Sequence, residues 1–159
     1  MNHGTLCCRI ESPIGPLVLA GDGEVLTHIR FHGESDLKWR EAPEPFADAI
    51  AQLRAYFAGE LTAFDLAVRP QGTPFQQSVW RALLDIPYGE TTSYGAIAKL
   101  IGKPDAVRAV GAANGANPIP IVIPCHRVIG ASGKLTGFGG GLDVKEKLLR
   151  LESRQLRML

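Results

Sequence analysis

The stretch IPCHRVIG, residues 123–130, places a cysteine next to a histidine inside an otherwise apolar run. A free cysteine in such a run is usually a small buried hydrophobe. It becomes a strong nucleophile when nearby groups stabilise its thiolate or take up its proton. Adjacent residues of an extended backbone point to opposite faces, so we expect His126 to reach Cys125 through a bridging water. From these residues alone, packing and nucleophilic roles for Cys125 both stay open.

A cysteine–histidine pair also needs a carboxylate that orients the imidazole, and Glu152 near the C-terminus is a candidate. On its own, an acidic residue at such a place is usually a solvated side chain. A Cys–His–Glu set is shared with thiol hydrolases, but those enzymes also need an oxyanion hole, and no motif here indicates one. A thiol hydrolase therefore stays an alternative.

The backbone that leads into the cysteine, NPIPIVIPC over residues 117–125, is stiffened by three prolines. Asn117 stands at its start, where a turn is expected. The segment just before this turn is predicted to be a helix, so the helix, the turn and Cys125 follow one another directly. A group delivered by the helix would have a short distance to travel to the sulfur.

Residues 93–114 predict two short helices joined by a glycine-containing turn, which fits a helix-turn-helix or an ordinary helical hairpin. The second helix is unusually smooth. Ala106, Ala109 and Gly111 are small, and Arg108 is its one long side chain. Such a helix can approach a groove of DNA closely and insert Arg108 into the base stack, which favours displacement of a base over reading of its edges.

These residues need elements that position them. TLCCRI, PLVLA and VLTHIRF are short β-type segments separated by turn signals, and FDLAV (residues 64–68) predicts one more strand. Residues 43–59 show helical spacing and end at Gly59. After a boundary at residues 69–73, Thr73 and Pro74 predict the start of a new helix. We therefore predict an α+β protein.

Its N-terminal domain, residues 1–72, is a small β-sheet with a helix, and its C-terminal domain, residues 73–159, is mainly helical and contains the helix-turn-helix. The first part holds six Lys/Arg against ten Asp/Glu, and the second holds eleven against six. The balance is thus −4 and then +5, so the C-terminal domain is the one compatible with a polyanion.

Composition indicates a folded globular protein, with 159 residues of which 45% are hydrophobic and 21% charged. No apolar run is long enough to span a bilayer, and the N-terminus lacks the features of a secretory signal. Three cysteines, two of them adjacent, argue against a disulfide framework. We expect a cytoplasmic protein with no membrane partner.

Several longer motifs resemble one family. VRAVGAANGANPIPIVIPCHRV, IPCHRVIGASGKLTGFGGG and FQQSVWRALLDIPYGETTSYGAIA are similar to the active-site domain of the O6-alkylguanine-DNA alkyltransferases, and SPIGPLVLA and AYFAGELTAFDL to their N-terminal domain. The resemblance implies an RNase H-like N-terminal domain with a structural role. It also implies direct-reversal repair: the alkyl group of O6-alkylguanine, and of O4-alkylthymine, in double-stranded DNA moves irreversibly to the protein's own cysteine.

The resemblance also implies roles for single residues. Cys125 accepts the alkyl group, and His126, acting through a water and assisted by Glu152, deprotonates the thiol. Asn117 holds the turn before the nucleophile. Tyr94 contacts the flipped base and donates a proton as the guanine leaves.

On the DNA side, Arg108 matches the family's intercalating arginine, with Ala106, Ala109 and Gly111 on the helix surface around it. Arg127 would be structural and tie the two domains together. The expected pocket residues are Val128, Phe138, Gly139, Gly140 and Pro120.

Some family members carry hydroxyl side chains at the positions of Phe138 and Gly139, so this pocket is expected to accept alkyl groups larger than methyl. Cys7, Cys8, His28 and His32 lack the usual spacing of zinc ligands, and we expect no metal and no cofactor. The protein is expected to act as a monomer without an obligate protein partner, with cooperative binding along DNA left open. A non-catalytic binder of alkylated DNA is a further alternative, which the presence of Cys125 disfavours.

Overall fold

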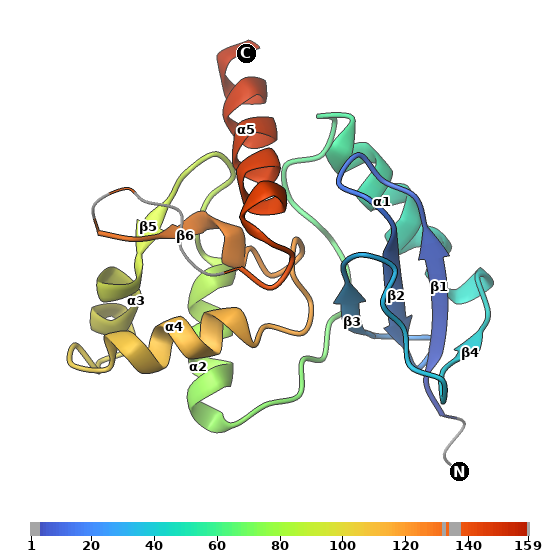
Figure 1. Cartoon of the computed structure of the whole chain (residues 1–159), viewed down its shortest axis with the longest axis horizontal. Helices are drawn as coiled ribbons and strands as arrows, with labels where there is room; N and C mark the ends of the chain where they lie inside the picture. Colours follow the sequence, from blue (N-terminus) through green and yellow to red (C-terminus); the bar gives the residue numbers. More distant parts are fainter. Residues whose placement is uncertain (1–3, 132, 134–137, 159) are drawn as a thin grey trace. The chain divides into compact units, whose positions relative to one another are not determined.

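The computed structural model divides into two units (Figure 1). The apolar segments near the N-terminus form the strands of the first unit. The structure describes residues 4–131, 133 and 138–158, and the units span Met1–Pro70 and Gln71–Leu159. The elements of the first unit are, in chain order, β1 (Leu6–Ile10), β2 (Leu17–Gly21), β3 (Leu26–Arg30), β4 (Arg40–Glu41), the 3-10 helix η1 (Glu44–Phe46) and α1 (Ala47–Phe57).

The four strands form one sheet in the order β3-β2-β1-β4, which confirms the three strands predicted from the sequence. β2 pairs antiparallel with both β1 and β3, and the two-residue β4 pairs parallel with β1. Every residue of β2 is buried, as expected for a central strand. α1 lies across one face of the sheet and buries Leu53 and Tyr56 completely (Figure 1).

Gly59 ends α1 as predicted. It has φ +77°, and its N–H donates to Tyr56 O while Glu60 N donates to Ala55 O at 2.8 Å. A left-handed glycine just after the helix satisfies the last carbonyls in this way.

The strand predicted at residues 64–68 is wrong. The structure has only an isolated bridge there, with Leu26 N donating to Ala67 O and Arg69 N donating to Leu26 O. The physical reason is a competing partner: Gln52 of α1 binds both the N–H and the C=O of Asp65 through its side-chain amide. The backbone is thus satisfied without a ladder.

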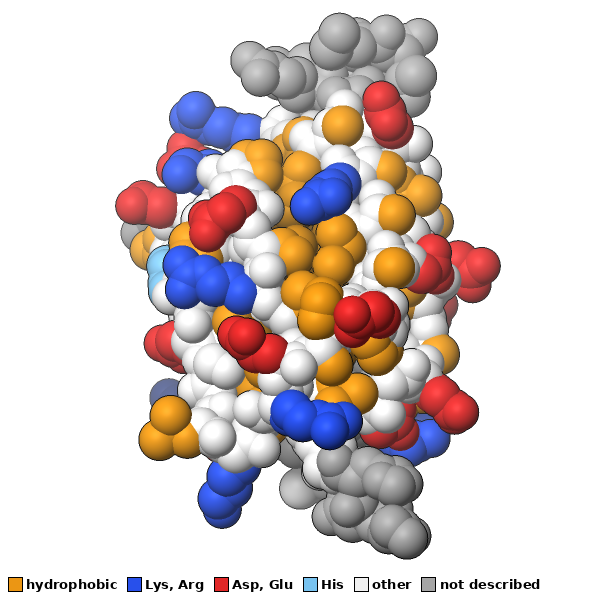
Figure 2. Space-filling view, turned by 90° about the vertical axis from the view of Figure 1, so that its right-hand side faces the viewer, with side chains coloured by type: hydrophobic (Ala, Val, Ile, Leu, Met, Phe, Trp, Pro, Cys, Tyr) orange, Lys and Arg blue, Asp and Glu red, His pale blue; other side chains and the backbone are white. Residues whose placement is uncertain are grey.

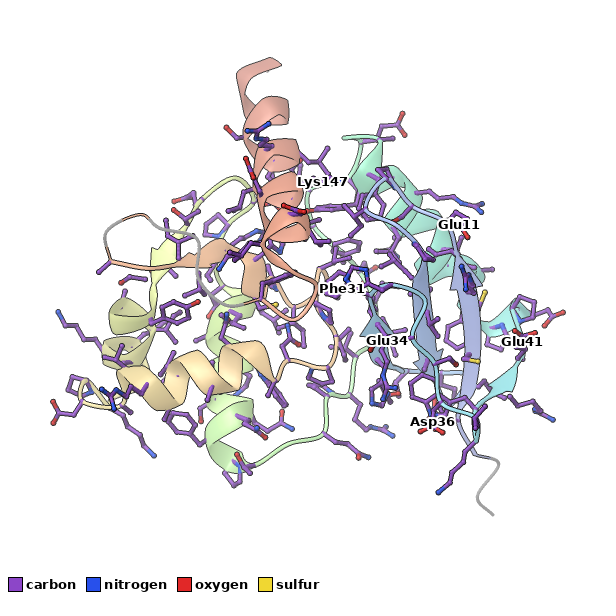
Figure 3. The ribbon with its side chains drawn as sticks, in the orientation of Figure 1. Glu11, Phe31, Glu34, Asp36, Glu41 and Lys147 are labelled. Carbon is purple, nitrogen blue, oxygen red and sulfur yellow. The ribbon has the colours of Figure 1, made fainter. Side chains whose placement is uncertain are left out.

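Charges of both signs are exposed on the first unit. Figure 2 shows acidic and basic side chains interspersed around apolar ones on one face. The acidic residues labelled in Figure 3, Glu11, Glu34, Asp36 and Glu41, are spread over β4 and the segments that follow β1 and β3. No continuous basic surface is evident on the side shown in Figure 2.

The second unit is mainly helical. Its elements are α2 (Pro74–Leu84), β5 (Thr92–Ser93), α3 (Tyr94–Leu100), α4 (Val107–Gly115), the 3-10 helix η2 (Cys125–Arg127), β6 (Val128–Ile129) and α5 (Leu142–Met158). β5 and β6 form a short parallel pair that the sequence did not predict. None of the helices in the described ranges combines the length and apolar character needed to cross a bilayer.

The predicted helix starts are confirmed. Thr73 and Gln76 form a capping box at α2, each side chain bonding the other's backbone N–H, with Pro74 as the first helical residue. At the start of α3, Ser93 Oγ accepts from Ala96 N at 3.1 Å. α3 and α4 then pack together as the helix-turn-helix, so the predicted fold class is confirmed.

The capping box gives a stability prediction. Thr73→Ala leaves the Gln76 N–H without its acceptor and should lower the free energy of unfolding by about 1 kcal/mol. Urea denaturation followed by tryptophan fluorescence measures this for the Thr73→Ala variant and its parent, both in a Trp39→Phe background. Trp80 of α2 is then the one remaining tryptophan of the chain's two. Exposed Thr91 lies outside any helix, and Thr91→Ala is the control. An equal loss in both variants would contradict the capping role.

Candidate active site

A tight buried turn precedes the cysteine. Ile123 N donates to Ile119 O at 3.0 Å, and between them Ile121 takes a left-handed conformation with φ 74° while only 1% exposed. A β-branched residue at positive φ is strained and persists only where its surroundings fix it. Asn117 supplies part of that fixation, because its Oδ1 accepts from Ile119 N at 3.0 Å and its Nδ2 donates to Ile123 O at 2.8 Å.

Cys125 follows this turn directly. Pro124 has φ −79° and ψ 65°, an inverse γ-turn, and Cys125 N donates across it to Ile123 O at 2.7 Å. Cys125 and His126 then form the first two residues of η2. The expectation of an extended backbone here is therefore wrong, because the 3-10 turn is closed by Val128 N donating to Cys125 O.

The thiol is buried and hard to ionise. Cys125 is 4% exposed, and burial raises the pKa of its thiol to about 11, although a hydrogen bond from Asn117 and the charge of Lys145 both act to lower it. Lys145, on α5, is itself buried and donates from Nζ to Val128 O at 2.7 Å. Burial lowers the pKa of Lys145, and the nearby Cys125 opposes that effect.

The neighbouring histidine is buried and bonded to a carboxylate. His126 is fully buried, and its Nε2 lies 2.7 Å from Glu152 Oε2. A carboxylate only accepts, so Nε2 carries the proton, and burial lowers the pKa of His126, which favours the neutral ring. Nδ1 is then an unprotonated acceptor, and it has no hydrogen-bond partner within the described ranges.

Glu152 is held from three sides although it is fully buried. Besides His126, it accepts from Arg127 Nε at 2.8 Å and Nη2 at 3.0 Å, and from Gly89 N at 3.2 Å. The guanidinium neutralises the carboxylate inside the protein, as a buried charge requires. Arg127 Nη1 also donates to Ile86 O at 2.7 Å. All these bonds lie in the second unit, so the expected role of Arg127 between domains finds no support in them.

The structure therefore brings together Cys125, His126, Glu152 and Asn117. The set offers a protected thiol, an adjacent neutral base, a carboxylate that fixes the base, and an amide that bonds the sulfur. Lys145 adds a buried cation whose charge favours the thiolate. That combination suits attack on an electrophile that enters the protein and is shielded from water.

Of the other predicted residues, Tyr94 lies on α3, and Arg108, Ala109 and Gly111 lie on α4. Tyr94 begins α3 and is half-buried, and a side-chain carbon added at Gly111 would lie 3.9 Å from its ring. Gly111 thus faces α3. Arg108 and Ala109 are exposed on α4, and Ala106 is the residue just before it.

The expected pocket residues are only partly described. Val128 and Pro120 are buried, Phe138 is half-buried, Gly139 is exposed and Gly140 is buried. Gly137, in the same loop, lies outside the described residues. We find no group of three or more His, Cys, Asp or Glu placed to hold a metal in the ranges that the structure describes.

Sequence reasoning missed two residues. Lys145 sits at helical spacing from Leu148 and Glu152, and this spacing puts it on the buried face of α5. Asn114 lies on the buried face of α4 and donates from Nδ2 to Cys125 O at 3.3 Å. In both cases the signal was a polar residue in register with the apolar face of a helix.

Known proteins with the same sequence features make the family clear. A family model described as "6-O-methylguanine DNA methyltransferase, ribonuclease-like domain" matches residues 6–70, and one described as its "DNA binding domain" matches residues 74–154. A methylated-DNA–protein-cysteine methyltransferase from Mycobacterium bovis is 61% identical over 147 residues, which cover 90% of this chain and 89% of the relative.

Solved structures agree. The crystal structure of Mycobacterium tuberculosis O6-methylguanine methyltransferase has a TM-score of 0.90 and 57% identity, covering 95% of this chain and 94% of that one. The structure of M. tuberculosis OGT in complex with DNA has a TM-score of 0.89 and 60% identity, covering 92% of both chains. This chain belongs to the O6-methylguanine-DNA methyltransferase family, whose curated members are named methylated-DNA–protein-cysteine methyltransferases.

Proposed function

We propose that this protein repairs DNA by moving the alkyl group of O6-alkylguanine irreversibly onto its own Cys125. The observation that carries the proposal is a buried hydrogen bond of 2.7 Å between Glu152 of α5 and His126. His126 directly follows Cys125 in the 3-10 turn η2. The name of the relatives supports it, since it specifies methylated DNA as the donor and a protein cysteine as the acceptor.

The first step is activation of the thiol. The pKa of Cys125, raised to about 11, keeps the sulfur protonated in the resting protein, so a base has to take the proton when substrate is in place. His126 Nδ1 is that base, through a bridging water, because Nε2 is occupied by Glu152. The imidazolium that forms is stabilised by the Glu152 carboxylate, and the thiolate by Lys145 and Asn117.

The second step is displacement at the alkyl carbon. The sulfur forms a bond to that carbon while the bond from carbon to O6 breaks, and its electron pair moves into the guanine ring. Tyr94, which stands at the start of α3, donates a proton to the leaving base. The proton that His126 took from the thiol then passes through water to the Tyr94 phenolate, so that both side chains return to their neutral forms. The products are guanine and a thioether at Cys125. A thioether has no route back to the thiol here, so each molecule acts once, and the step as written uses no metal or cofactor.

DNA is bound by the helix-turn-helix of the second unit. α4 presents Arg108 and Ala109 on its exposed face, so a helix with small side chains can lie in a groove while the guanidinium fills the place of a displaced base. The match of residues 74–154 to a DNA-binding domain, and a relative solved in complex with DNA, support binding of DNA by this unit. The +5 balance of residues 73–159 agrees with a polyanionic partner.

We infer that O4-alkylthymine is a second substrate, that the small residues Gly139 and Gly140 leave room for alkyl groups larger than methyl, and that the protein works as a cytoplasmic monomer. Residues 1–72 form a structural domain, and residues 73–159 bind DNA and carry the reactive centre. The mixed charges on the face of the first unit in Figure 2 fit a domain that does not bind DNA there.

Stoichiometric methylation is the direct expectation. Incubation with duplex DNA containing O6-methylguanine should add one methyl group to the intact protein, and peptide mapping should place it on Cys125. The Cys125→Ser variant should gain none. Repair of many lesions per protein without a change in mass would indicate a hydrolase, and binding without any gain would indicate a non-catalytic binder.

Arg108 is expected to act on duplex DNA and not in the transfer step itself, so its removal should affect the two kinds of substrate differently. Arg108→Ala should slow methyl transfer from duplex DNA by about tenfold or more, because the displaced base loses its replacement in the stack, and should leave reaction with free O6-benzylguanine within about twofold. Single-turnover kinetics on both substrates measure this. Ala112→Ser, also exposed on α4, is the control. Equal slowing on both substrates would contradict the role.

The raised pKa of Cys125 predicts how the free protein reacts with iodoacetamide. Because the thiolate is the reactive form and the pKa lies at about 11, the rate at Cys125 should rise about tenfold per pH unit from pH ~6.5 to ~9.5 without levelling off. Peptide mapping separates this cysteine from Cys7 and Cys8. A plateau below pH ~8 would show an already ionised thiol and contradict the need for a base.

A further inference from the structure

Asn114 is a buried polar residue that the chemistry above does not use. It lies in the last turn of α4, is 2% exposed and, with Val110 and Ala113, faces the interior. Its two neighbours on that face are apolar. Its Nδ2 donates to Cys125 O at 3.3 Å, while its Oδ1 has no hydrogen-bond partner among the residues that the structure describes.

An amide with one unsatisfied atom is a poor choice for simple packing, because a buried polar atom without a partner destabilises the fold. Cys125 O does not need the amide either, since it already accepts from Val128 N within η2. An apolar side chain of the same size would therefore pack here without leaving the Cys125 carbonyl unsatisfied. The placement of Asn114 calls for a role other than stability.

The bond it makes joins two parts of the proposed machinery. The backbone of Cys125 is otherwise tied to its own turn, by its N–H to Ile123 O and by the bond from Val128. Asn114 connects this turn to α4, the helix assigned above to DNA. The same turn of α4 is anchored separately by Trp80, whose Nε1 donates to Ala113 O at 2.8 Å.

We propose that Asn114 is a positioning residue that keeps Cys125 in register with α4, so that the sulfur stands in line with the alkyl carbon of a base displaced by that helix. The proposal rests on the function proposed above. In-line displacement is sensitive to small errors in placement, so the effect concerns substrates that α4 delivers. A free base, which α4 does not hold, can adjust its own position.

The test compares two substrates in the full-length protein. Asn114→Leu keeps the size of the side chain and removes the amide, and it should slow single-turnover transfer from O6-methylguanine in duplex DNA by about tenfold. The rate with free O6-benzylguanine should stay within about threefold of the unmodified protein, the affinity for undamaged DNA should be unchanged, and the melting temperature should be equal or higher. Asn114→Ser, which cannot reach Cys125 O, should show the same selective loss if the leucine variant does not fold.

Trp80→Phe is the matched control, because it removes the other buried bond to the same turn of α4 without touching Cys125. It should lower the melting temperature and not reproduce the selective loss on DNA. Parallel slowing of the Asn114 variants on both substrates, or the same selectivity in Trp80→Phe, would overturn the proposal. If the unmodified protein moves no methyl group from DNA to Cys125, the function itself is wrong, and this role fails with it.

Discussion

The reactive centre depends on one buried carboxylate. Glu152 is shielded from water and has to find all its partners inside the protein. It does so by binding the Arg127 guanidinium through two nitrogens, the backbone N–H of Gly89, and Nε2 of His126. These bonds join α5, η2 and the segment between α2 and β5. They also decide the tautomer of the histidine, and with it which nitrogen can act as a base.

Removal of the Glu152 carboxylate or of the Arg127 guanidinium would leave the other charge buried and uncompensated, which costs about 3–5 kcal/mol in comparable pairs. The arrangement therefore fixes geometry and function together. A second cation, Lys145, donates to Val128 O, and its charge acts to lower the pKa of the Cys125 thiol. A pKa of about 11 keeps the thiol protonated in the resting protein, and under the proposed function a base takes the proton only when a substrate is in place.

Local sequence signals predicted much of the fold. Strands β1, β2 and β3, the end of α1 at Gly59 and the cap of α2 at Thr73 each follow from residue preferences that act over a few positions. The strand expected at residues 64–68 failed because a side chain distant in sequence, Gln52, takes its backbone bonds. The pairing of β5 with β6 was missed because two-residue strands carry no periodic pattern.

The site, like the fold, contains residues that the sequence predicted and residues that it did not. Cys125, His126 and Glu152 were predicted from a motif and a resemblance, and the structure brings them together. Lys145 and Asn114 were not predicted, because a polar residue becomes informative only once the buried face of its helix is known. The conformation of Ile121 had no signal either, since a β-branched residue argues against positive φ.

The central claim is that Glu152 acts on the thiol through His126. A double-mutant cycle tests it most directly: single-turnover methyl transfer is measured for His126→Ala, Glu152→Gln and the double variant, each checked for folding by circular dichroism. If the two residues form one relay, the double variant should be no slower than His126→Ala alone, within about twofold. Rate losses that multiply would show independent roles and contradict the relay.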